Sequence, residues 1–343
     1  FKPILRDAKY LPPYKRTINT LDESGQSLLH WAVRKDSLQA AENFVAKFGD
    51  INIRDNNGIT AVEWAAALER QELLIFLIDL GAEIPGTLKI YNLEEMKKNI
   101  QKERNNKAKQ RVKELPQDEE ETDLDLSFCF FTRFPPLLEA GNSITKLSLA
   151  YNKLTKIPEV VFELKNLRSL DLSHNLLDSL SDRMEELSLQ HFDVSYNQLS
   201  EFPKITELSA KWTKLDVSHN FISSIPAEIN KLYRLIHFDC SYNHLKELPK
   251  SIVEILGIQN LNVSNNFISH LRDIPIHLLS SLETLDLSYN QFVVIPYADI
   301  MNSQTIKNFY FSHNKIPELI YRTLKCYFNQ TVSLDLSSMN LTA

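Results

Sequence analysis

Glycine is scarce in this chain: only 7 of the 343 residues are glycines, and they are not clustered. A phosphate-binding loop or a dinucleotide fingerprint needs several glycines within a few residues, so this segment contains neither. The metal-binding patterns H-E-x-x-H and C-x-x-C are also absent from the sequence. We therefore expect a non-enzymatic segment with no cofactor, no metal site and no small-molecule substrate.

Long apolar runs, paired cysteines and excess positive charge are missing too. No run of about twenty apolar residues occurs, so no membrane span is predicted. Cys129, Cys240 and Cys326 are too dispersed for a disulfide framework, which favours a reducing compartment and predicts a cytoplasmic protein. The formal net charge of -6 argues against nucleic-acid binding. The chain begins at Phe1 without a signal-peptide pattern, and we interpret it as a piece of a longer protein.

Two stretches near the start repeat one another, "INTLDESGQSLLHWA" and "INIRDNNGITAVEWA", with Gly25 and Gly58 in matching positions 33 residues apart. Asp-x-x-Gly closes a tight turn, and the apolar spacing after each turn predicts a pair of helices. The period and the text Ser-Leu-Leu-His ending at His30 resemble the ankyrin repeat. This resemblance implies an ankyrin-repeat domain over residues 1–86 with degenerate caps.

Three side chains of this region, His30, Trp31 and Trp64, form a candidate site, but aromatic residues at repeat positions normally belong to the core. We expect His30 to bond the turn backbone and both tryptophans to pack between helices. The following residues, 87–121, interleave lysine, arginine and glutamate and end in an acidic stretch, which predicts an exposed helical linker. A basic handle for an acidic partner or an anionic lipid is the alternative.

From residue 122 to 343 the text L-x-L-x-x-N-x-L recurs, with asparagines 22 to 24 residues apart. Cys129 takes the place of asparagine in the first unit, and Met339 takes it in the last. The pattern resembles the short intracellular type of leucine-rich repeat. About ten repeats are implied, each with a short strand. The expected fold class is an α/β repeat solenoid, in which a short ankyrin helix-pair stack precedes a curved parallel-sheet horseshoe. The matching asparagines are Asn152, Asn175, Asn197, Asn220, Asn243, Asn266, Asn290 and Asn314.

Two positions of each repeat are expected to face the concave side of the sheet. Aspartate dominates between the two leucines, and tyrosine alternates with histidine just before the asparagine. Aspartate is a common consensus residue at its position in this repeat, whereas exposed tyrosines are favoured anchors for a protein partner. Strands about 4.8 Å apart align the aspartates in a row, and a basic partner would relieve their repulsion. The predicted partner site is Tyr151, Asp171, His174, Asp193, Tyr196, Asp216, His219, Asp239, Tyr242, Asp286, Tyr289 and His313.

The order of the two repeat regions resembles the N-terminal part of Roco-type leucine-rich-repeat kinases. From the repeats we predict a protein-protein interaction scaffold or adaptor in signalling, which binds a protein partner on the concave leucine-rich face and on the ankyrin surface. Two alternatives are a regulatory arm of a larger signalling enzyme and a substrate receptor for a ubiquitin ligase.

Overall fold

The computed structural model describes residues 17–47, 49–86, 88–115, 122–132, 144–296, 302–303, 305–316 and 333–335. The chain divides into two compact units, Phe1–Lys107 and Ala108–Ala343. This division falls inside the segment 87–121, whose limits as a linker stay a prediction. In the part of the chain that is described, no helix has both the length and the apolar character needed to cross a bilayer.

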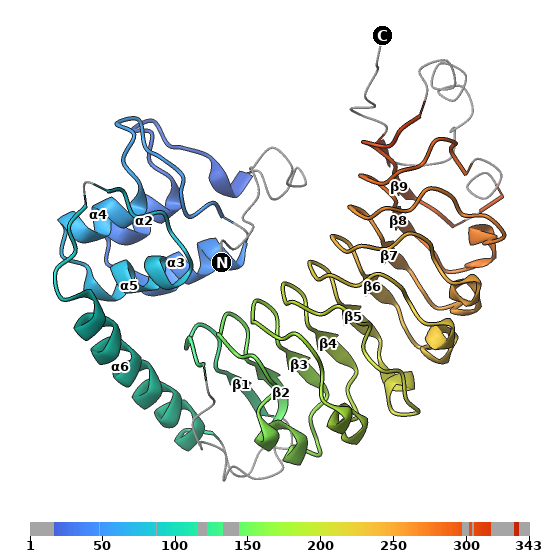
Figure 1. The fold of residues 1–343 in the computed structure, drawn as a ribbon, viewed down its shortest axis with the longest axis horizontal. Helices are drawn as coiled ribbons and strands as arrows, with labels where there is room; N and C mark the ends of the chain where they lie inside the picture. The colour runs from blue at the N-terminus through green and yellow to red at the C-terminus, as the bar shows by residue number, and fades with distance from the viewer. Residues whose placement is uncertain are drawn as a thin grey trace. The chain divides into compact units, whose positions relative to one another are not determined.

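The first unit is built from antiparallel helix pairs, as the sequence predicts (Figure 1). Helix α2 pairs with α3 and α4 pairs with α5, and the second pair stacks on the first through α2 with α4 and α3 with α5. A short 3-10 turn, η2, precedes them. Their bounds are η2 Thr17–Asn19, α2 Leu28–Arg34, α3 Leu38–Ala46, α4 Ala61–Ala67 and α5 Gln71–Asp79.

The turns before α2 and α4 explain the repeated Asp-x-x-Gly text. The Asp55 carboxylate accepts hydrogen bonds from the backbone N–H groups of Asn57 and Ile59, both at 2.9 Å. Gly25 and Gly58 have φ of 71° and 75°, in the left-handed region that glycine enters without strain. The turn chemistry predicted from the sequence is therefore present in both repeats.

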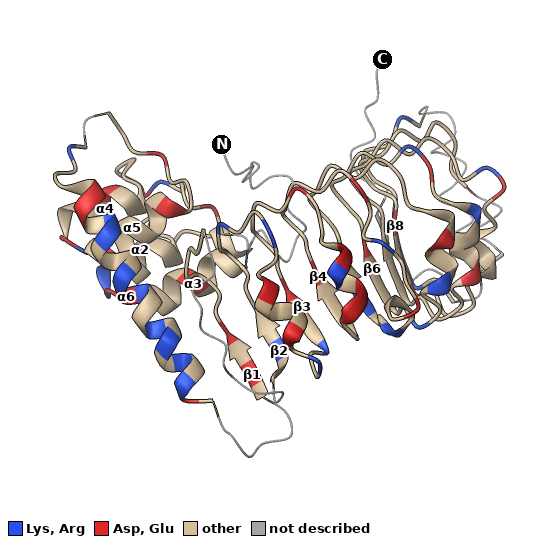
Figure 2. Cartoon of the chain, turned by 60° about the horizontal axis from the view of Figure 1, so that its bottom comes forward, with Lys and Arg blue, Asp and Glu red and all other residues tan. Residues whose placement is uncertain are grey.

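Helix α6, Leu93–Lys113, follows the ankyrin helices and carries lysines and arginines along its length (Figure 2). Within the first unit, Arg104 of this helix donates to Asp79 at 2.8 Å, and their side chains are only 6% and 11% exposed. Within the second unit, Ala108 is fully buried in the hydrophobic core. The helix is present, as expected from the sequence. The expectation that it is exposed on all sides is wrong, because Arg104 and Ala108 are buried.

The second unit contains one ten-stranded parallel sheet with its strands in sequence order (Figure 1). Short 3-10 turns lie on the convex side, and several follow a proline, such as Pro226 before η6 and Pro249 before η7. The strands are β1 Thr122–Asp125, β2 Ile144–Ser148, β3 Ser169–Asp171, β4 His191–Asp193, β5 Lys214–Asp216, β6 His237–Asp239, β7 Asn260–Asn262, β8 Thr284–Asp286, β9 Asn308–Tyr310 and β10 Ser333–Asp335. The convex turns are η3 Glu159–Glu163, η4 Asp182–Glu186, η5 Ser209–Lys211, η6 Ala227–Lys231, η7 Lys250–Glu254 and η8 Ile276–Leu278.

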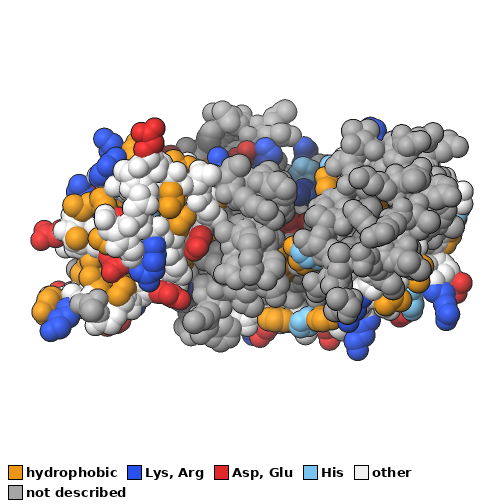
Figure 3. Space-filling model, turned by 90° about the horizontal axis from the view of Figure 1, so that it is seen from above, with side chains coloured by type: hydrophobic (Ala, Val, Ile, Leu, Met, Phe, Trp, Pro, Cys, Tyr) orange, Lys and Arg blue, Asp and Glu red, His pale blue; other side chains and the backbone are white. Residues whose placement is uncertain are grey.

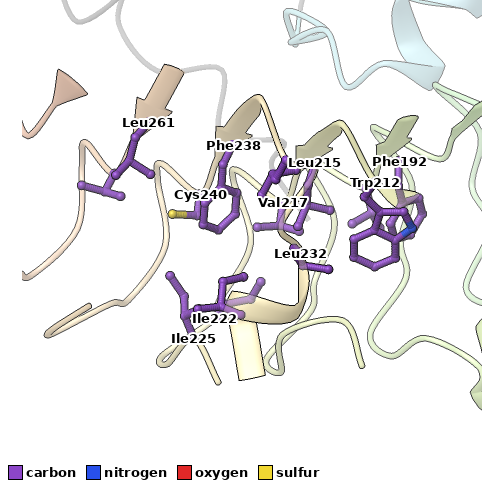
Figure 4. Packing of buried hydrophobic residues seen from close by; sticks show 14 of the residues in the cluster. Phe192, Trp212, Leu215, Val217, Ile222, Ile225, Leu232, Phe238, Cys240 and Leu261 are labelled. Carbon is purple, nitrogen blue, oxygen red and sulfur yellow. The ribbon is translucent and has the colours of Figure 1, made fainter. Parts of the chain in front are cut away.

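The core of this unit lies between the strands and the convex turns (Figure 4). Phe192 and Phe238 point inward from their strands and are 1% exposed. Cys240 replaces an inward leucine, is 1% exposed, and is surrounded by apolar side chains (Figure 4). The thiol thus acts as a small apolar group, as the sequence predicts.

The buried asparagines form a ladder that satisfies the backbone where each strand ends. Asn197 shows the pattern: its Nδ2 donates to the carbonyls of Leu172, Val194 and Ser195 at 2.9, 3.1 and 3.1 Å. Its Oδ1 accepts from the N–H of Leu177 at 2.9 Å. Because the same bonds recur in the neighbouring repeats, the asparagine spacing fixes the register of the sheet.

Candidate functional site

The strand register aligns the predicted aspartates on the concave face. Asp171 pairs with Asp193, Asp193 with Asp216, and Asp216 with Asp239 across the sheet. We call these four residues the acidic row. In Figure 2, red acidic segments recur along the strands of the sheet. The row expected from the sequence is confirmed by this register, and Asp286 continues it after Asn262.

Each aspartate is held by the serine two residues later. Asp193 Oδ1 accepts from the backbone N–H of Ser195 at 3.0 Å and from its hydroxyl at 2.7 Å. Burial, together with the neighbouring Asp171, raises the pKa of Asp193 to about 6. Burial, with Asp239 and Asp193 on either side, raises the pKa of Asp216 well above its usual range. The charged forms of Asp193 and Asp216 are therefore unfavourable without a cation nearby.

A second column, with basic side chains, lies on the same face beside the acidic row. His191, Lys214 and His237 pair with one another in register and are exposed. Lys214 lies near enough to Asp193 to favour the carboxylate, against the larger effect of burial. Lys214 was not among the residues predicted from the sequence, although it occupies the variable position just before the inward leucine in its repeat. This repeat position was the feature of the sequence from which Lys214 could have been predicted to lie on the concave face.

The tyrosines and histidines form a continuous stack of rings. We call Phe128, Tyr151, His174, Tyr196, His219 and Tyr242 the ring ladder. Successive ring planes lie within 14° of parallel. From Phe128 to Tyr242 the successive ring centroids are 4.2, 4.0, 4.0, 3.8 and 3.9 Å apart. Tyr289 and His313 stack in the same way at 4.0 Å.

The backbone of the ring ladder is in the left-handed region, with φ of 54° at His174 and Tyr196 and 53° at Tyr242. Asparagine tolerates this conformation well, whereas a tyrosine there carries a cost of about 1 kcal/mol. The conformation is needed because the N–H of Tyr196 donates to the carbonyl of Ser218 in the next repeat at 3.0 Å. Rings are thus kept at positions where asparagine would cost less, and their stacking offsets the strain.

The stacked rings are half-buried, which corrects the expectation of exposed tyrosines. Each ring covers the face of the next, because the repeats bring the rings closer than the strand spacing of about 4.8 Å. Burial, with Asp171 and Asp193 nearby, raises the pKa of the Tyr151 phenol, so the hydroxyl stays neutral at physiological pH. Contact of these residues with a partner stays a prediction.

The ankyrin side chains singled out above have different environments. His30 is fully buried, and its Nε2 lies 3.0 Å from the carbonyl oxygen of Ile59, which confirms its place in the turn. Trp64 is half-buried and donates from Nε1 to Asp55 Oδ2 at 3.2 Å. Trp31 is 42% exposed, so the expectation that it packs between helices is wrong. Figure 3 shows hydrophobic side chains interspersed with charged ones on this unit, at the left.

Across the residues described, no group of three or more histidine, cysteine, aspartate or glutamate side chains could hold a metal ion. The acidic row does not form such a group, because each carboxylate is turned toward its own serine. The arrangement as a whole places polar, charged and ring groups along the concave side of the sheet, with repeated spacing.

Comparison with protein families identifies the class. The model for ankyrin repeats matches residues 6–87, and the model for leucine-rich repeats matches residues 142–199 and 257–316. The chain is therefore a repeat protein in which ankyrin repeats are followed by leucine-rich repeats.

Individual curated relatives match about a fifth of the chain. Calmodulin-binding transcription activator 3 of Arabidopsis thaliana is 41% identical over 70 residues, which is 20% of this chain and 7% of that protein. Ankyrin repeat protein 14 of Vaccinia virus (strain Western Reserve) is 38% identical over 77 residues, 22% of this chain and 32% of that protein. The chain thus matches a third or less of the length of these relatives.

Solved structures match more than half of the chain. An internalin, InlF, from Listeria monocytogenes has a TM-score of 0.52 at 20% identity, covering 60% of this chain and 58% of that chain. The leucine-rich ectodomain of the Arabidopsis receptor kinase HAESA, in complex with an N-terminally extended IDA peptide hormone, has a TM-score of 0.51 at 26% identity. That match covers 63% of this chain and 38% of the HAESA chain. The first of these structures supports the fold alone.

Proposed function

We propose that this segment is a non-catalytic scaffold whose concave leucine-rich face binds an extended, basic stretch of a protein partner. The observation that carries this proposal is the acidic row lying beside the ring ladder on the concave side of the sheet. The similarity to the HAESA ectodomain, which is in complex with a peptide hormone, supports a peptide as the ligand.

The spacing of the face suits a peptide better than a small molecule. The acidic row extends over four strands that are about 4.8 Å apart, and an extended peptide places successive side chains of one face about 6.6 Å apart. Several cationic side chains can therefore approach the row together. A cation beside Asp193 stabilises a carboxylate whose charged form is disfavoured by burial, so binding recovers electrostatic energy that the free protein lacks.

The ankyrin unit offers a second, independent contact. Leu28 and Trp31 of α2 are 55% and 42% exposed, and large aromatic side chains are favoured anchors at interfaces. We place the segment in the cytoplasm, since Cys240 is a buried thiol without a disulfide. The same surfaces would also serve the regulatory arm of a larger signalling enzyme or a ubiquitin-ligase receptor. A phosphate-binding loop and kinase motifs after Ala343 would mark the former.

Affinity capture with the whole chain, followed by mass spectrometry, tests the proposal. The first variant carries Asp193→Asn with Asp216→Asn, and Asn262 shows that asparagine fits this position, since its Oδ1 accepts from the N–H of Ser264 at 3.1 Å. The matched control is Asp178→Asn, an exposed aspartate that also bonds a neighbouring serine, at 2.7 Å. We expect the variant, but not the control, to lose the partner by about tenfold or more, as removing two charged contacts implies.

A second pair of variants tests the ring ladder without breaking the stack. Tyr196→Phe with Tyr242→Phe removes two hydroxyls, and Phe128 shows that phenylalanine stacks in this ladder. Tyr233→Phe, on an exposed tyrosine beside η6, is the control. The proposal is wrong if the same proteins are captured in the same amounts by the wild type and by both concave variants.

A further inference from the structure

Three basic side chains lie next to one another on the concave face, in the column that precedes the acidic row. His191 pairs with Lys214, and Lys214 pairs with His237, in the parallel register of the sheet. All three residues are exposed, and we call them the basic cluster. Successive strands are about 4.8 Å apart, so an anion above Lys214 has a histidine on either side of it.

The positive charge of this column is confined to the three strands of the basic cluster. The strand before His191 carries Ser169 in the same column, and the strand after His237 carries Asn260. Over the described strands β3 to β9, no carboxylate occupies the column. The basic cluster is therefore a local feature of three repeats and not a general property of the repeat array.

The central lysine and the first histidine have free polar atoms. In the part of the chain that the structure describes, neither Lys214 Nζ nor the His191 ring has a hydrogen-bond or ion-pair partner. Lys146, in the same column, differs because it pairs with Asp123 at 3.0 Å. Burial, together with Lys214 and His237, lowers the pKa of His191, so its ring is neutral at pH 7 and donates from one nitrogen.

The second histidine is oriented by its neighbour. Asn260 Nδ2 lies 2.8 Å from His237 Nδ1. An amide nitrogen donates and does not accept, so Nδ1 accepts this bond and the neutral ring carries its proton on Nε2. His237 Nε2 has no partner among the described residues. This ring therefore offers one N–H donor, and its orientation is already fixed.

The basic cluster restricts what the concave face can bind. Residues two apart in a strand lie on the same face about 6.6 Å apart, and Lys214 has this relation to Asp216 of the acidic row. A uniformly basic peptide on the acidic row would be repelled by the basic cluster, whereas an isolated anion on the basic cluster would be repelled by the acidic row. A peptide that carries an anion next to its cations satisfies both.

A phosphate monoester suits the basic cluster better than a carboxylate does. It has three oxygens that accept hydrogen bonds and a charge of about −1.5 to −2 at pH 7. The three side chains of the cluster can each donate to one of these oxygens, with the lysine as the central point charge. A carboxylate has two oxygens and a single charge, so it leaves one donor without a charged acceptor.

We propose that the basic cluster binds a phosphorylated side chain of the partner, while cationic side chains of the same peptide lie on the acidic row. This inference rests on the proposed function, because it assigns a second kind of side chain to the peptide that the concave face binds. It also makes the interaction conditional: the partner binds tightly only after it has been phosphorylated.

The test is an NMR titration of the whole chain, with histidine rings labelled with nitrogen-15, against the tripeptide acetyl-phosphoserine-glycine-lysine amide. His191→Asn and His237→Asn variants assign the two ring signals, and Asn260 shows that asparagine fits this column. Both signals should shift and saturate. The same tripeptide with aspartate in place of phosphoserine should need about tenfold higher concentration, because it brings less charge and one acceptor fewer. Inorganic phosphate should also need about tenfold more, because it lacks the lysine that reaches the acidic row.

Lys214→Asn removes the central charge of the cluster and should weaken binding of the phosphorylated tripeptide by about tenfold or more, with an unchanged Tm. The matched control is Lys231→Asn, on an exposed lysine of the convex turn η6, which should bind as the wild type does. Undiminished binding by Lys214→Asn would overturn the proposal. Equal affinity for the aspartate tripeptide or for inorganic phosphate would also overturn it.

Two further measurements separate this inference from its alternatives. Dimethyl phosphate represents the phosphodiester of a nucleic acid or a lipid, and tighter binding of this compound than of the phosphorylated tripeptide would overturn the proposal. In the variant with Asp193→Asn and Asp216→Asn, inorganic phosphate should still shift both histidine signals. Failure of the basic cluster is therefore distinguishable from failure of the acidic row, which the capture experiment tests.

Discussion

Replacing one asparagine of the buried ladder should destabilise the leucine-rich unit strongly, and Asn220→Ala is the sharpest case. Asn220 is 5% exposed. Its Nδ2 donates to the carbonyls of Val194, Val217 and Ser218 at 3.0, 3.0 and 3.1 Å, and its Oδ1 accepts from the N–H of Leu199 at 2.9 Å. Alanine removes all four bonds and adds no group that replaces them.

The size of the stability loss depends on which backbone groups lose their hydrogen-bond partner. Leu199 is 1% exposed, so its N–H loses its partner in a place that water does not reach. The carbonyl of Val194 keeps a bond from Asn197 Nδ2 at 3.1 Å, so it is not orphaned. A buried polar group left unsatisfied costs about 1–3 kcal/mol, and the remaining bonds contribute about 1 kcal/mol in total. We expect a loss of about 3 kcal/mol, or about 6–12 °C in Tm for a unit of this size.

Urea and thermal unfolding, followed by circular dichroism on the whole chain, measure this loss. The matched control is Asn230→Ala, which removes a single bond to Glu254 at 2.8 Å on the exposed convex side and should cost under about 0.5 kcal/mol. If Asn220→Ala and Asn230→Ala unfold at the same denaturant concentration, the asparagine ladder does not hold the repeats together and the reasoning fails.

Three further predictions concern charge and exposure. Because the pKa of Asp193 is raised to about 6 from 3.8, the folded state keeps a proton that the unfolded state releases, and the free energy of unfolding falls as pH rises through that window. Asp193→Asn should therefore flatten this fall and raise Tm at pH 7, whereas parallel pH profiles for variant and wild type would contradict it. Arg104→Ala removes the guanidinium paired with Asp79 and should cost about 3 kcal/mol, against under about 1 kcal/mol for Lys107→Ala at its exposed pair with Glu72, both measured by urea unfolding. Trp31→Gln should change stability by less than about 0.5 kcal/mol because Trp31 is 42% exposed, and a loss comparable to that of Trp64→Gln would show that it is packed in solution.

Much of the fold follows from the sequence because each repeat encodes the same local structure. The leucine and asparagine spacing fixes the register, so the alignment of Asp171 with Asp193 could be predicted before any coordinates. The Asp-x-x-Gly turns fix where α2 and α4 begin, for the same reason. In both the ankyrin and the leucine-rich regions, the turn residues and the spacing of apolar residues predict the same structure in each repeat.

Other features depend on side-chain packing that no repeat pattern states. The alternation of tyrosine and histidine indicates a shared face, but the stacking of Tyr196 on His219 at 3.8 Å depends on how the rings tilt. The buried face of α6 was hidden because the stripe Ile100, Arg104, Ala108 has a charged residue at its centre. Trp31 and Trp64 occupy matching repeat positions, yet Trp64 is half-buried and Trp31 is 42% exposed, a difference that the repeat pattern does not predict.

The asparagine ladder also gives the leucine-rich unit a direction. Asn220 Oδ1 bonds Leu199, and Asn243 Oδ1 bonds Ile222 at 2.9 Å, so each asparagine completes the turn of the repeat that precedes it. Consider a whole repeat inserted between two others. Its asparagine would bond the turn of the repeat before it, and the asparagine of the repeat after it would bond its own turn. The domain can therefore lengthen in evolution, or by engineering, one complete unit at a time, and each unit adds a strand and one more concave position to choose. A cut that removes the last asparagine leaves the turn before it unfinished, so a truncated array needs a cap at its C-terminal end.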